Sequence, residues 1–342
     1  MERLRIGVIG VGRIGRMHVE NLVHLVPEAE VVAIADVRRE VAERCAAALH
    51  IPNAYDDARW ILEDPSIDAV VICSSTDTHA TFIEQAAEVG KHIFCEKPIA
   101  LDLSAIDKAL AAVNRAGVFL QVGFNRRFDP SFRKLHDLIA EGVLGIPYIL
   151  RITSRDPKPP PLDYVPSSGG MFLDMTIHDF DMARFLIGDE IETIYAEAAV
   201  RIDPRIKEYD DVDIAVITLR FKSGTLGTID NSRRAPYGYD QRIEVLGSKG
   251  MAIVGNKLSD ELKVYTTEGV HLACPLYFFP ERYKEAFVAE MKDFVRNILK
   301  NRQPSVSGEE GRLAALLAHA AKRSLKEGRP VRPSEIGPFN YG

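Results

Sequence analysis

The stretch Leu4-Arg5-Ile6-Gly7-Val8-Ile9-Gly10-Val11-Gly12-Arg13-Ile14-Gly15 decides the first fold prediction. Its first six residues form a mostly apolar run typical of a buried strand, and the pattern from Arg13 to Leu25 predicts an amphipathic helix. Between strand and helix, three glycines follow the spacing Gly-x-Gly-x-x-Gly. A strand that leads through this spacing into a helix is the pattern of a dinucleotide-binding loop.

Each glycine of this loop has a distinct physical role. Gly10 permits the tight turn, Gly12 lets a pyrophosphate approach the backbone, and Gly15 lets helix and strand pack closely. The helix N-terminus adds free N–H groups and partial positive charge. Asp36, 21 positions after Gly15, ends the second predicted strand and can accept hydrogen bonds from the adenosine ribose hydroxyls. We therefore expect a dinucleotide here, the alternative being glycines that serve packing alone.

The charges beside this loop favour NAD over NADP. The Asp36 carboxylate would repel a 2′-phosphate, although the nearby Arg38 and Arg39 could hold one. The hydroxyls of Ser74 and Thr76 could bond the cofactor or simply cap the next helix, and a histidine at position 79 is more often structural. The full set of predicted cofactor contacts is Gly10, Gly12, Arg13, Ile14, Gly15, Asp36, Arg38, Ser74, Thr76, His79, Glu96 and Lys97.

Residues 1–124 are predicted to form one doubly wound domain. Apolar strands alternate with amphipathic helices, which favours a parallel sheet covered on both faces. The further strands are expected at 30–35, 69–73, 92–95 and 118–122, and the further helices at 37–49, 57–62, 77–89 and 104–116.

Residues 125–342 are predicted to form a second, α+β domain around a large open mixed or antiparallel sheet. Residues 156–170 contain several prolines and are expected to be irregular, as a stiff connector or a lid. The strands are expected at 148–153, 191–202, 212–221, 225–232 and 242–246, with turns at 222–224 and 247–250. The helices are expected at 128–141, 169–187, 281–299 and 309–326.

The strand at 212–221 is apolar on both faces. Helices of the same chain can cover one face, so the other meets a second subunit or is buried within the chain. The sequence leaves these alternatives open.

Composition limits the class of partner. The net charge is −6 and the basic pairs are scattered, which gives no support for nucleic-acid or anionic-membrane binding. No apolar run approaches the ~20 residues of a membrane span, and the N-terminus shows no signal-peptide pattern. The four cysteines form no CxxC pair and are typical of small buried residues. These features predict a cytoplasmic protein.

A lysine follows the predicted strand at 92–95, in the stretch Cys95-Glu96-Lys97-Pro98. The carboxyl ends of parallel strands are where open α/β sheets bind ligands. Lys97 would then meet a substrate hydroxyl beside a nicotinamide. The alternative is a surface lysine in a strand-to-helix turn.

Asp174 and His178 lie four residues apart on the predicted helix at 169–187, so they would share one helical face. Burial among apolar neighbours would be costly for both without a partner or ligand. Histidine suits general-base work because its pKa lies near neutrality. The pair could instead serve the core or bind a metal, but the sequence has no HExxH motif or cysteine pair, and we predict no metal.

Together these motifs resemble the glucose–fructose oxidoreductase and inositol dehydrogenase family, over essentially the whole chain. Within that family, the stretches at 154–157, 169–186 and 230–242 are similar to inositol 2-dehydrogenases. The resemblance implies an N-terminal Rossmann domain, a C-terminal domain with an open mixed sheet, and dimers or tetramers built through that sheet.

The resemblance also implies a reaction, the NAD-dependent oxidation of a cyclic polyol or sugar, foremost myo-inositol to its 2-keto product. Lys97 and His178 would flank the reacting carbon and Asp174 would support them. Contacts to the polyol are implied for Lys97, Arg127, Asp156, Asp174, His178 and Tyr237. Another inositol isomer or an aldose, an NAD-dependent glycosidase, and a non-catalytic NAD sensor are the alternatives.

Overall fold

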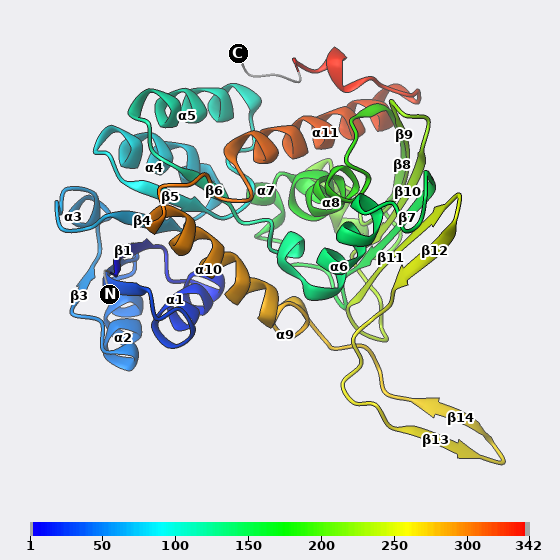
Figure 1. Ribbon diagram of the computed structural model, residues 1–342, viewed down its shortest axis with the longest axis horizontal. Coiled ribbons are helices and arrows are strands. Elements are labelled where there is room, and N and C mark those ends of the chain that lie inside the picture. Colours follow the sequence, from blue (N-terminus) through cyan, green and yellow to red (C-terminus); the bar gives the residue numbers. More distant parts are fainter. Residues whose placement is uncertain (1–2, 339–342) are drawn as a thin grey trace. The chain divides into compact units, whose positions relative to one another are not determined.

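The structure is a computed structural model that describes residues 3–338 (Figure 1). The chain divides into two compact units. Unit 1 contains residues 3–128 and 285–315, and unit 2 contains residues 129–284 and 316–338. The first boundary lies four residues beyond the predicted one. Residues 285–315, which we expected in the second domain, group instead with unit 1.

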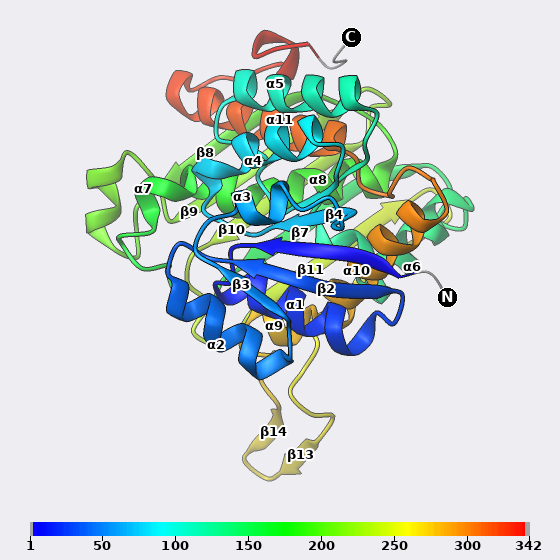
Figure 2. The same ribbon diagram turned by 90° about the vertical axis from the view of Figure 1, so that its left-hand side faces the viewer.

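Unit 1 is built on a parallel sheet with the strand order β3-β2-β1-β4-β5-β6. This order reverses direction between β1 and β4, which is the switch point where doubly wound sheets bind ligands. Figure 2 shows α1 and α2 on one side of the sheet and α4 and α5 on the other, so helices cover both faces, as predicted. The elements are β1 (Leu4–Ile9), α1 (Arg13–Leu25), β2 (Ala29–Ala35), α2 (Arg39–Leu49), β3 (Asn53–Tyr55), α3 (Arg59–Leu62), β4 (Ala69–Ile72), α4 (Thr76–Glu88), β5 (His92–Cys95), α5 (Leu103–Ala116) and β6 (Leu120–Val122).

A helix from late in the chain completes the core of unit 1. The amphipathic α10 (Lys284–Leu299) buries Met291, Phe294 and Val295 in the cluster that also holds Val19 of α1 and Phe94 of β5. The sequence showed the apolar stripe of this helix but not its partner. Packing between distant segments depends on the tertiary fold, which periodicity alone does not encode.

Unit 2 contains the predicted mixed sheet, in the order β12-β11-β7-β10-β9-β8. Only β7 and β10 pair in parallel, and the other neighbours are antiparallel. The elements are α6 (Pro130–Ala140), β7 (Pro147–Arg155), α7 (Val165–Ser168), α8 (Ile177–Ile187), β8 (Ile191–Ala199), β9 (Ile214–Phe221), β10 (Leu226–Ser232), β11 (Asp240–Gly247), β12 (Gly250–Val254), β13 (Lys263–Thr266), β14 (Gly269–Leu272) and α9 (Phe279–Arg282). Helix α11 (Gly308–Glu327) begins in unit 1 and ends in unit 2.

The structure corrects several local predictions. The helix expected at 281–299 is two helices, because Tyr283 leaves the helical region at φ −112° and ψ 19°. The proline-rich segment expected to be irregular contains the one-turn helix α7, in which Pro166 occupies an early position that needs no N–H donor. The hairpin β13–β14, which we did not predict, extends away from the large sheet (Figure 1). Cys274, expected to be buried, is exposed.

The two faces of the unit 2 sheet differ in burial. Along β9, Ala215, Ile217 and Leu219 are buried on the face that meets the helices, whereas Val216 on the opposite, outer face is 57% exposed. The outer face is therefore not covered by the described part of the chain at this strand. Among the described residues, no helix is long and apolar enough to cross a membrane.

Candidate active site

The glycine loop has the geometry that a pyrophosphate requires. At Gly10, φ is +86° and a Cβ atom would lie within 2.7 Å of the backbone at Cys73 and Ser74. At Gly15, a Cβ would lie 1.9 Å from the Gly10 carbonyl oxygen. A Cβ at Gly12 would have only open space within 4 Å among the described residues. Two glycines are thus required by the protein's own packing, and the third leaves room for a ligand.

The N-terminus of α1 faces this room. Gly12 is its N-cap residue, and no described side chain caps the helix. Its first N–H groups therefore remain available to an anion. The loop and the helix end fit the diphosphate of NAD.

The Asp36 carboxylate also bonds the backbone of the glycine loop, which the sequence did not predict. Its Oδ2 accepts a hydrogen bond from the Val11 N–H at 3.1 Å, and its Oδ1 accepts one from the Arg38 N–H at 3.0 Å. The Arg38 guanidinium lies 3.6 Å from the same carboxylate. Each carboxylate oxygen can accept a second bond, so Asp36 can hold the glycine loop and still receive a ribose hydroxyl.

The loop after β4 places Ser74, Thr76 and His79 at the same sheet edge. The Ser74 hydroxyl bonds that of Thr78 at 2.6 Å, and Thr76 begins α4. His79 is 2% exposed, and its ring nitrogens lie 2.8 Å from the Pro98 carbonyl oxygen and 3.1 Å from that of Ser74. His79 therefore links the loop at Ser74 to the turn at Pro98. Its contact with the cofactor stays a prediction.

Lys97 lies in the turn that follows β5 and is partly exposed. The peptide bond between Lys97 and Pro98 is cis. The preceding residue, Glu96, has its carboxylate on His18, with 2.8 Å between Oε1 and Nε2. The sequence predicted a cofactor contact for Glu96 and gave no sign of the histidine, which lies 78 positions earlier.

Arg127, which was predicted to contact the substrate, lies in a short 3-10 helix at Asn125–Phe128. It is 8% exposed, and its guanidinium forms an ion pair with Glu310 at the start of α11. Glu310 was not predicted, because only the return of the chain to unit 1 brings it there.

In unit 2, Asp174 and His178 lie on one continuous helical segment, as predicted, but that segment is not a regular α-helix throughout. Asp174 belongs to a π-helical turn at Phe172–Thr176, and His178 lies in the first turn of α8. Their four-residue spacing therefore lacks the meaning that it has in an α-helix. Such π turns are frequent at functional sites.

One arginine, Arg233, lies close to two of the predicted site acids in unit 2, Asp174 and Asp156. The sequence did not single it out. Arg233 Nη1 lies 2.8 Å from Asp174 Oδ2 and 3.7 Å from Asp156 Oδ2. Asp174 also accepts a hydrogen bond from the Tyr164 hydroxyl at 3.0 Å. Burial disfavours the charge of Arg233, but Asp174 and Asp156 outweigh it and raise its pKa. Unit 2 thus brings two predicted polyol contacts together around one fixed cation.

Tyr237 lies in a different cluster. Its hydroxyl donates to Asp240 at 2.7 Å and accepts from Arg155 at 3.1 Å, and Arg155 in turn bonds Asp230. Asp230 points to the outer face of β10, because the adjacent Asn231 points inward to α8. Tyr237 lines a cavity of about 500 Å³ with Arg155 and Asp230. Within unit 2, the structure therefore does not bring Tyr237 together with Asp174.

Comparison with known proteins agrees with this geometry. Residues 4–124 match the model of the oxidoreductase family with an NAD-binding Rossmann fold, and residues 132–253 match the GFO/IDH/MocA C-terminal domain. A myo-inositol 2-dehydrogenase of Thermotoga maritima is 49% identical over 97% of this chain and 99% of its own length.

Two solved structures are also similar over nearly the whole chain. A putative myo-inositol dehydrogenase of Sinorhizobium meliloti is 44% identical with a TM-score of 0.93, covering 96% of this chain and 99% of its own. The scyllo-inositol dehydrogenase of Lactobacillus casei, solved with NAD(H) and scyllo-inositol, is 29% identical with a TM-score of 0.90, covering 97% and 100%. The chain therefore belongs to the GFO/IDH/MocA family of oxidoreductases, with an N-terminal NAD-binding Rossmann fold.

Proposed function

We propose that this protein is an NAD-dependent dehydrogenase that oxidises a ring secondary alcohol of a cyclic polyol, converting myo-inositol to 2-keto-myo-inositol. The observation that carries the proposal is the 49% identity, over almost the full length of both chains, to the T. maritima myo-inositol 2-dehydrogenase. The glycine loop and Asp36 support the choice of NAD, and the partly exposed Lys97, Asp174 and His178 support catalysis rather than binding alone.

The proposed chemistry assigns one role to each side chain. His178 accepts the proton of the substrate hydroxyl as general base. Lys97 stabilises the developing alkoxide by its charge. Asp174, held by Tyr164 and Arg233, keeps a negative charge in place that favours the protonated imidazole. NAD, when bound, supplies the acceptor for the hydride.

The main test is NAD reduction over a panel of inositol stereoisomers and aldoses. We expect steady NADH production with the highest rate on myo-inositol. Activity only on another inositol isomer, or only on an aldose, would identify a different substrate for an enzyme of the same family. NADH that fails to accumulate while a glycoside is cleaved would indicate a glycosidase, and NAD binding without turnover would indicate a sensor.

The role of His178 has a separate test. General-base catalysis contributes about 10²–10⁴-fold, so His178→Ala should lower turnover by that range and leave NAD affinity nearly unchanged. His24→Ala, at an exposed position at the end of α1, serves as the matched control and should be silent. Wild-type turnover in the His178 variant would remove this residue from the scheme.

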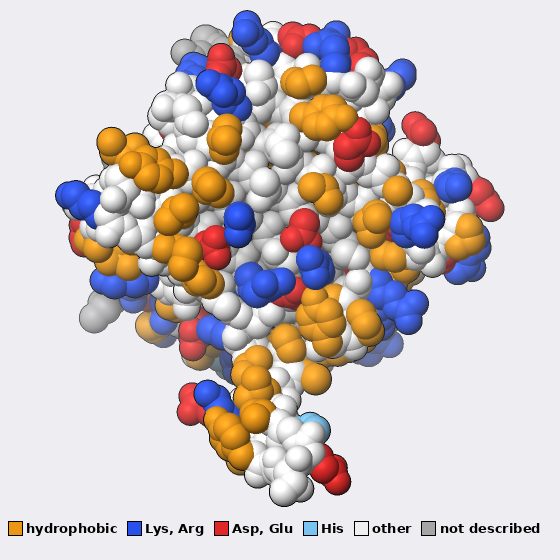
Figure 3. Space-filling view, turned by 90° about the vertical axis from the view of Figure 1, so that its right-hand side faces the viewer, with side chains coloured by type: hydrophobic (Ala, Val, Ile, Leu, Met, Phe, Trp, Pro, Cys, Tyr) orange, Lys and Arg blue, Asp and Glu red, His pale blue; other side chains and the backbone are white. Residues whose placement is uncertain are grey.

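We further propose that the protein forms a homo-oligomer, a dimer or a tetramer, through the outer face of the unit 2 sheet. Hydrophobic side chains form several patches on the side of the molecule in Figure 3, with charged residues between them. The exposed apolar residues of the sheet's outer face include Val216, Leu226, Leu246, Met251 and Ile253.

A substitution that introduces one charged side chain tests the proposed oligomer interface. Ile253→Glu should lower the mass measured by light scattering, because it places a charge in the proposed interface. Val37→Glu, at a 90% exposed position in unit 1, is the control and should leave the mass unchanged. A monomeric wild-type protein would refute the interface.

We place the enzyme in the cytoplasm and in inositol catabolism, on the strength of its NAD site and free cysteines.

A further inference from the structure

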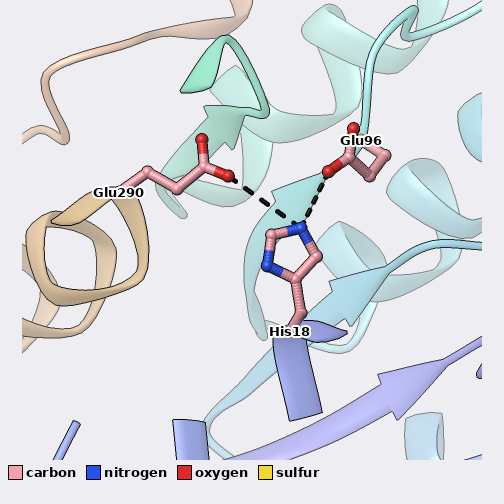
Figure 4. Close-up of side chains that lie close together, drawn as sticks. All are labelled: His18, Glu96 and Glu290. Carbon is pink, nitrogen blue, oxygen red and sulfur yellow. Dashed lines mark hydrogen bonds and ion pairs between the residues drawn. The ribbon is translucent and has the colours of Figure 1, made fainter. Parts of the chain in front are cut away.

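Three ionisable side chains of unit 1, those of His18, Glu96 and Glu290, lie close together (Figure 4), and Glu96 directly precedes Lys97. His18 comes from α1, Glu96 from the turn after β5, and Glu290 from α10. The His18 Nε2 atom lies 2.8 Å from Glu96 Oε1 and 3.9 Å from Glu290 Oε1. His18 and Glu290 are fully buried, and the side chain of Glu96 is 14% exposed. Two acids and a histidine at such a depth are costly, and the proposed reaction does not itself use them.

The two carboxyl groups of the cluster differ in their surroundings. Burial, with the neighbouring Glu96 charge, raises the pKa of Glu290 well above its ordinary value. Neither carboxyl oxygen of Glu290 has a hydrogen-bond partner among the described residues. Burial therefore favours the uncharged form of Glu290, and the short hydrogen bond of the cluster is the 2.8 Å contact between His18 Nε2 and Glu96 Oε1.

The same carboxylate holds the backbone of Lys97. Glu96 Oε2 accepts the Lys97 N–H at 3.3 Å. On its other side lies Gly123, at the end of β6, where a Cβ atom would come within 3.0–3.2 Å of the carboxyl group. The carboxylate is thus confined by His18, by Gly123 and by the peptide that it holds.

A second buried imidazole holds the other side of Lys97. His79 contacts the Pro98 carbonyl oxygen at 2.8 Å. His18 lies on the helix that begins at the glycine loop, and His79 lies on the helix that begins at Ser74–Thr76. Both loops at the predicted cofactor edge are therefore mechanically connected to the lysine turn.

We propose that His18, acting through the Glu96 carboxylate, is a positioning residue that fixes Lys97 for reaction, with His79 holding the Pro98 side of the same turn. The inference rests on the proposed function, in which Lys97 is a catalytic group. It assigns Glu96 to the lysine turn rather than to the cofactor.

A metal site is the main rival, since the ligand atoms of His18, Glu96 and Glu290 all lie within 4.8 Å of one another. A metal would have to replace the short bond between His18 and Glu96 and ionise Glu290 against its raised pKa. The rings of Phe94 and Phe287 also lie edge-on against His18, at 5.2 and 5.7 Å between centroids. The existing hydrogen bonds favour positioning.

The experiment compares turnover and NADH affinity in three variants. His18→Leu removes the donor to Glu96 and should lower kcat by about 10–100-fold, the range for a displaced catalytic group, with NADH affinity within about 2-fold. His18→Gln keeps a donor at a similar reach and should restore most of the loss. Glu290→Gln should leave kcat unchanged, because an uncharged amide replaces an uncharged acid.

A double-mutant cycle with Lys97→Met separates positioning from a general structural role. If His18 acts through Lys97, then His18→Leu in the Lys97→Met background should add almost no further loss. Additive losses, or wild-type kcat in His18→Leu, would overturn the positioning role while leaving the proposed function intact. Wild-type kcat in Lys97→Met would overturn both.

The metal alternative has its own readout. Elemental analysis of the purified protein should find less than stoichiometric metal in the wild type and in His18→Leu alike. A stoichiometric metal ion that His18→Leu or Glu290→Gln releases would overturn the proposal.

Discussion

Replacing Glu290 by glutamine should make the protein more stable at neutral and alkaline pH, with a gain that grows as pH rises. Glu290 is fully buried in the folded state, and desolvation, then the charge of Glu96, raises its pKa well above 4.5. Between the unfolded and folded pKa values, the folded protein binds one proton more than the unfolded chain does. Its contribution to stability is therefore fully present below pH ~4.5 and is lost as pH rises toward the folded pKa.

The pH dependence of the free energy of unfolding is limited because Glu290 binds a single proton. A single site changes the free energy of unfolding by at most about 1.4 kcal/mol per pH unit. Glutamine cannot ionise, so the difference between variant and wild type should rise toward this slope above pH 5. All other titrating groups are shared and cancel in the difference. Each kcal/mol corresponds to roughly 2–4 °C in Tm for a chain of moderate size.

Urea denaturation at pH 5, 6, 7 and 8 measures this slope. The chain has one tryptophan, Trp60 on α3, which belongs to unit 1 as Glu290 does, so its fluorescence reports on the right unit. Glu88→Gln, at an exposed position of α4 in the same unit, is the matched control for the removal of one carboxyl group. A difference that stays constant with pH, or a Glu290→Gln variant less stable at every pH, would refute an uncharged Glu290.

Three further predictions concern the binding residues. Gly12→Ala should leave Tm nearly unchanged, since a Cβ there meets no atom of the described residues within 4 Å. It should nevertheless weaken NADH binding at least ~10-fold in a fluorescence titration, because the methyl group blocks the pyrophosphate. Asp36→Ser should shift the ratio of NAD to NADP affinity by about 10–100-fold toward NADP, with Arg38 available to the 2′-phosphate; an unchanged ratio would contradict the role of the carboxylate. Arg233→Gln should destabilise the protein by about 3–5 kcal/mol in thermal or urea unfolding, because it leaves Asp174 without its buried partner; a loss below ~1 kcal/mol would show that this pair is dispensable.

The parts of the fold that the sequence predicted are those that local patterns encode. The run from Leu4 to Gly15 specifies a strand, a turn and a helix through neighbouring residues alone, and the parallel sheet follows from repeating that unit. The family-model match and the strand order confirm this part. The position of Lys97 at the end of β5 follows from the same logic.

The parts that escaped prediction depend on contacts between distant segments. No local pattern showed that α10 would complete the core of unit 1 or that Glu310 would meet Arg127. The π turn at Asp174 changes the helical register without any glycine or proline to mark it. Likewise, no local pattern showed that Tyr237 would bond Arg155 and Asp240.

Because α10 lies late in the sequence, the core of unit 1 stays incomplete for much of the protein's synthesis. The ribosome completes the six-stranded sheet of unit 1 long before residues 285–299 exist, and it synthesises residues 129–284 in the interval. At ~5–20 residues per second, the apolar surface beside Val19 and Phe94 waits roughly 10–30 s for Met291, Phe294 and Val295. The nascent sheet therefore needs protection from aggregation during this interval, and a fragment that stops at Phe128 would keep that surface exposed permanently.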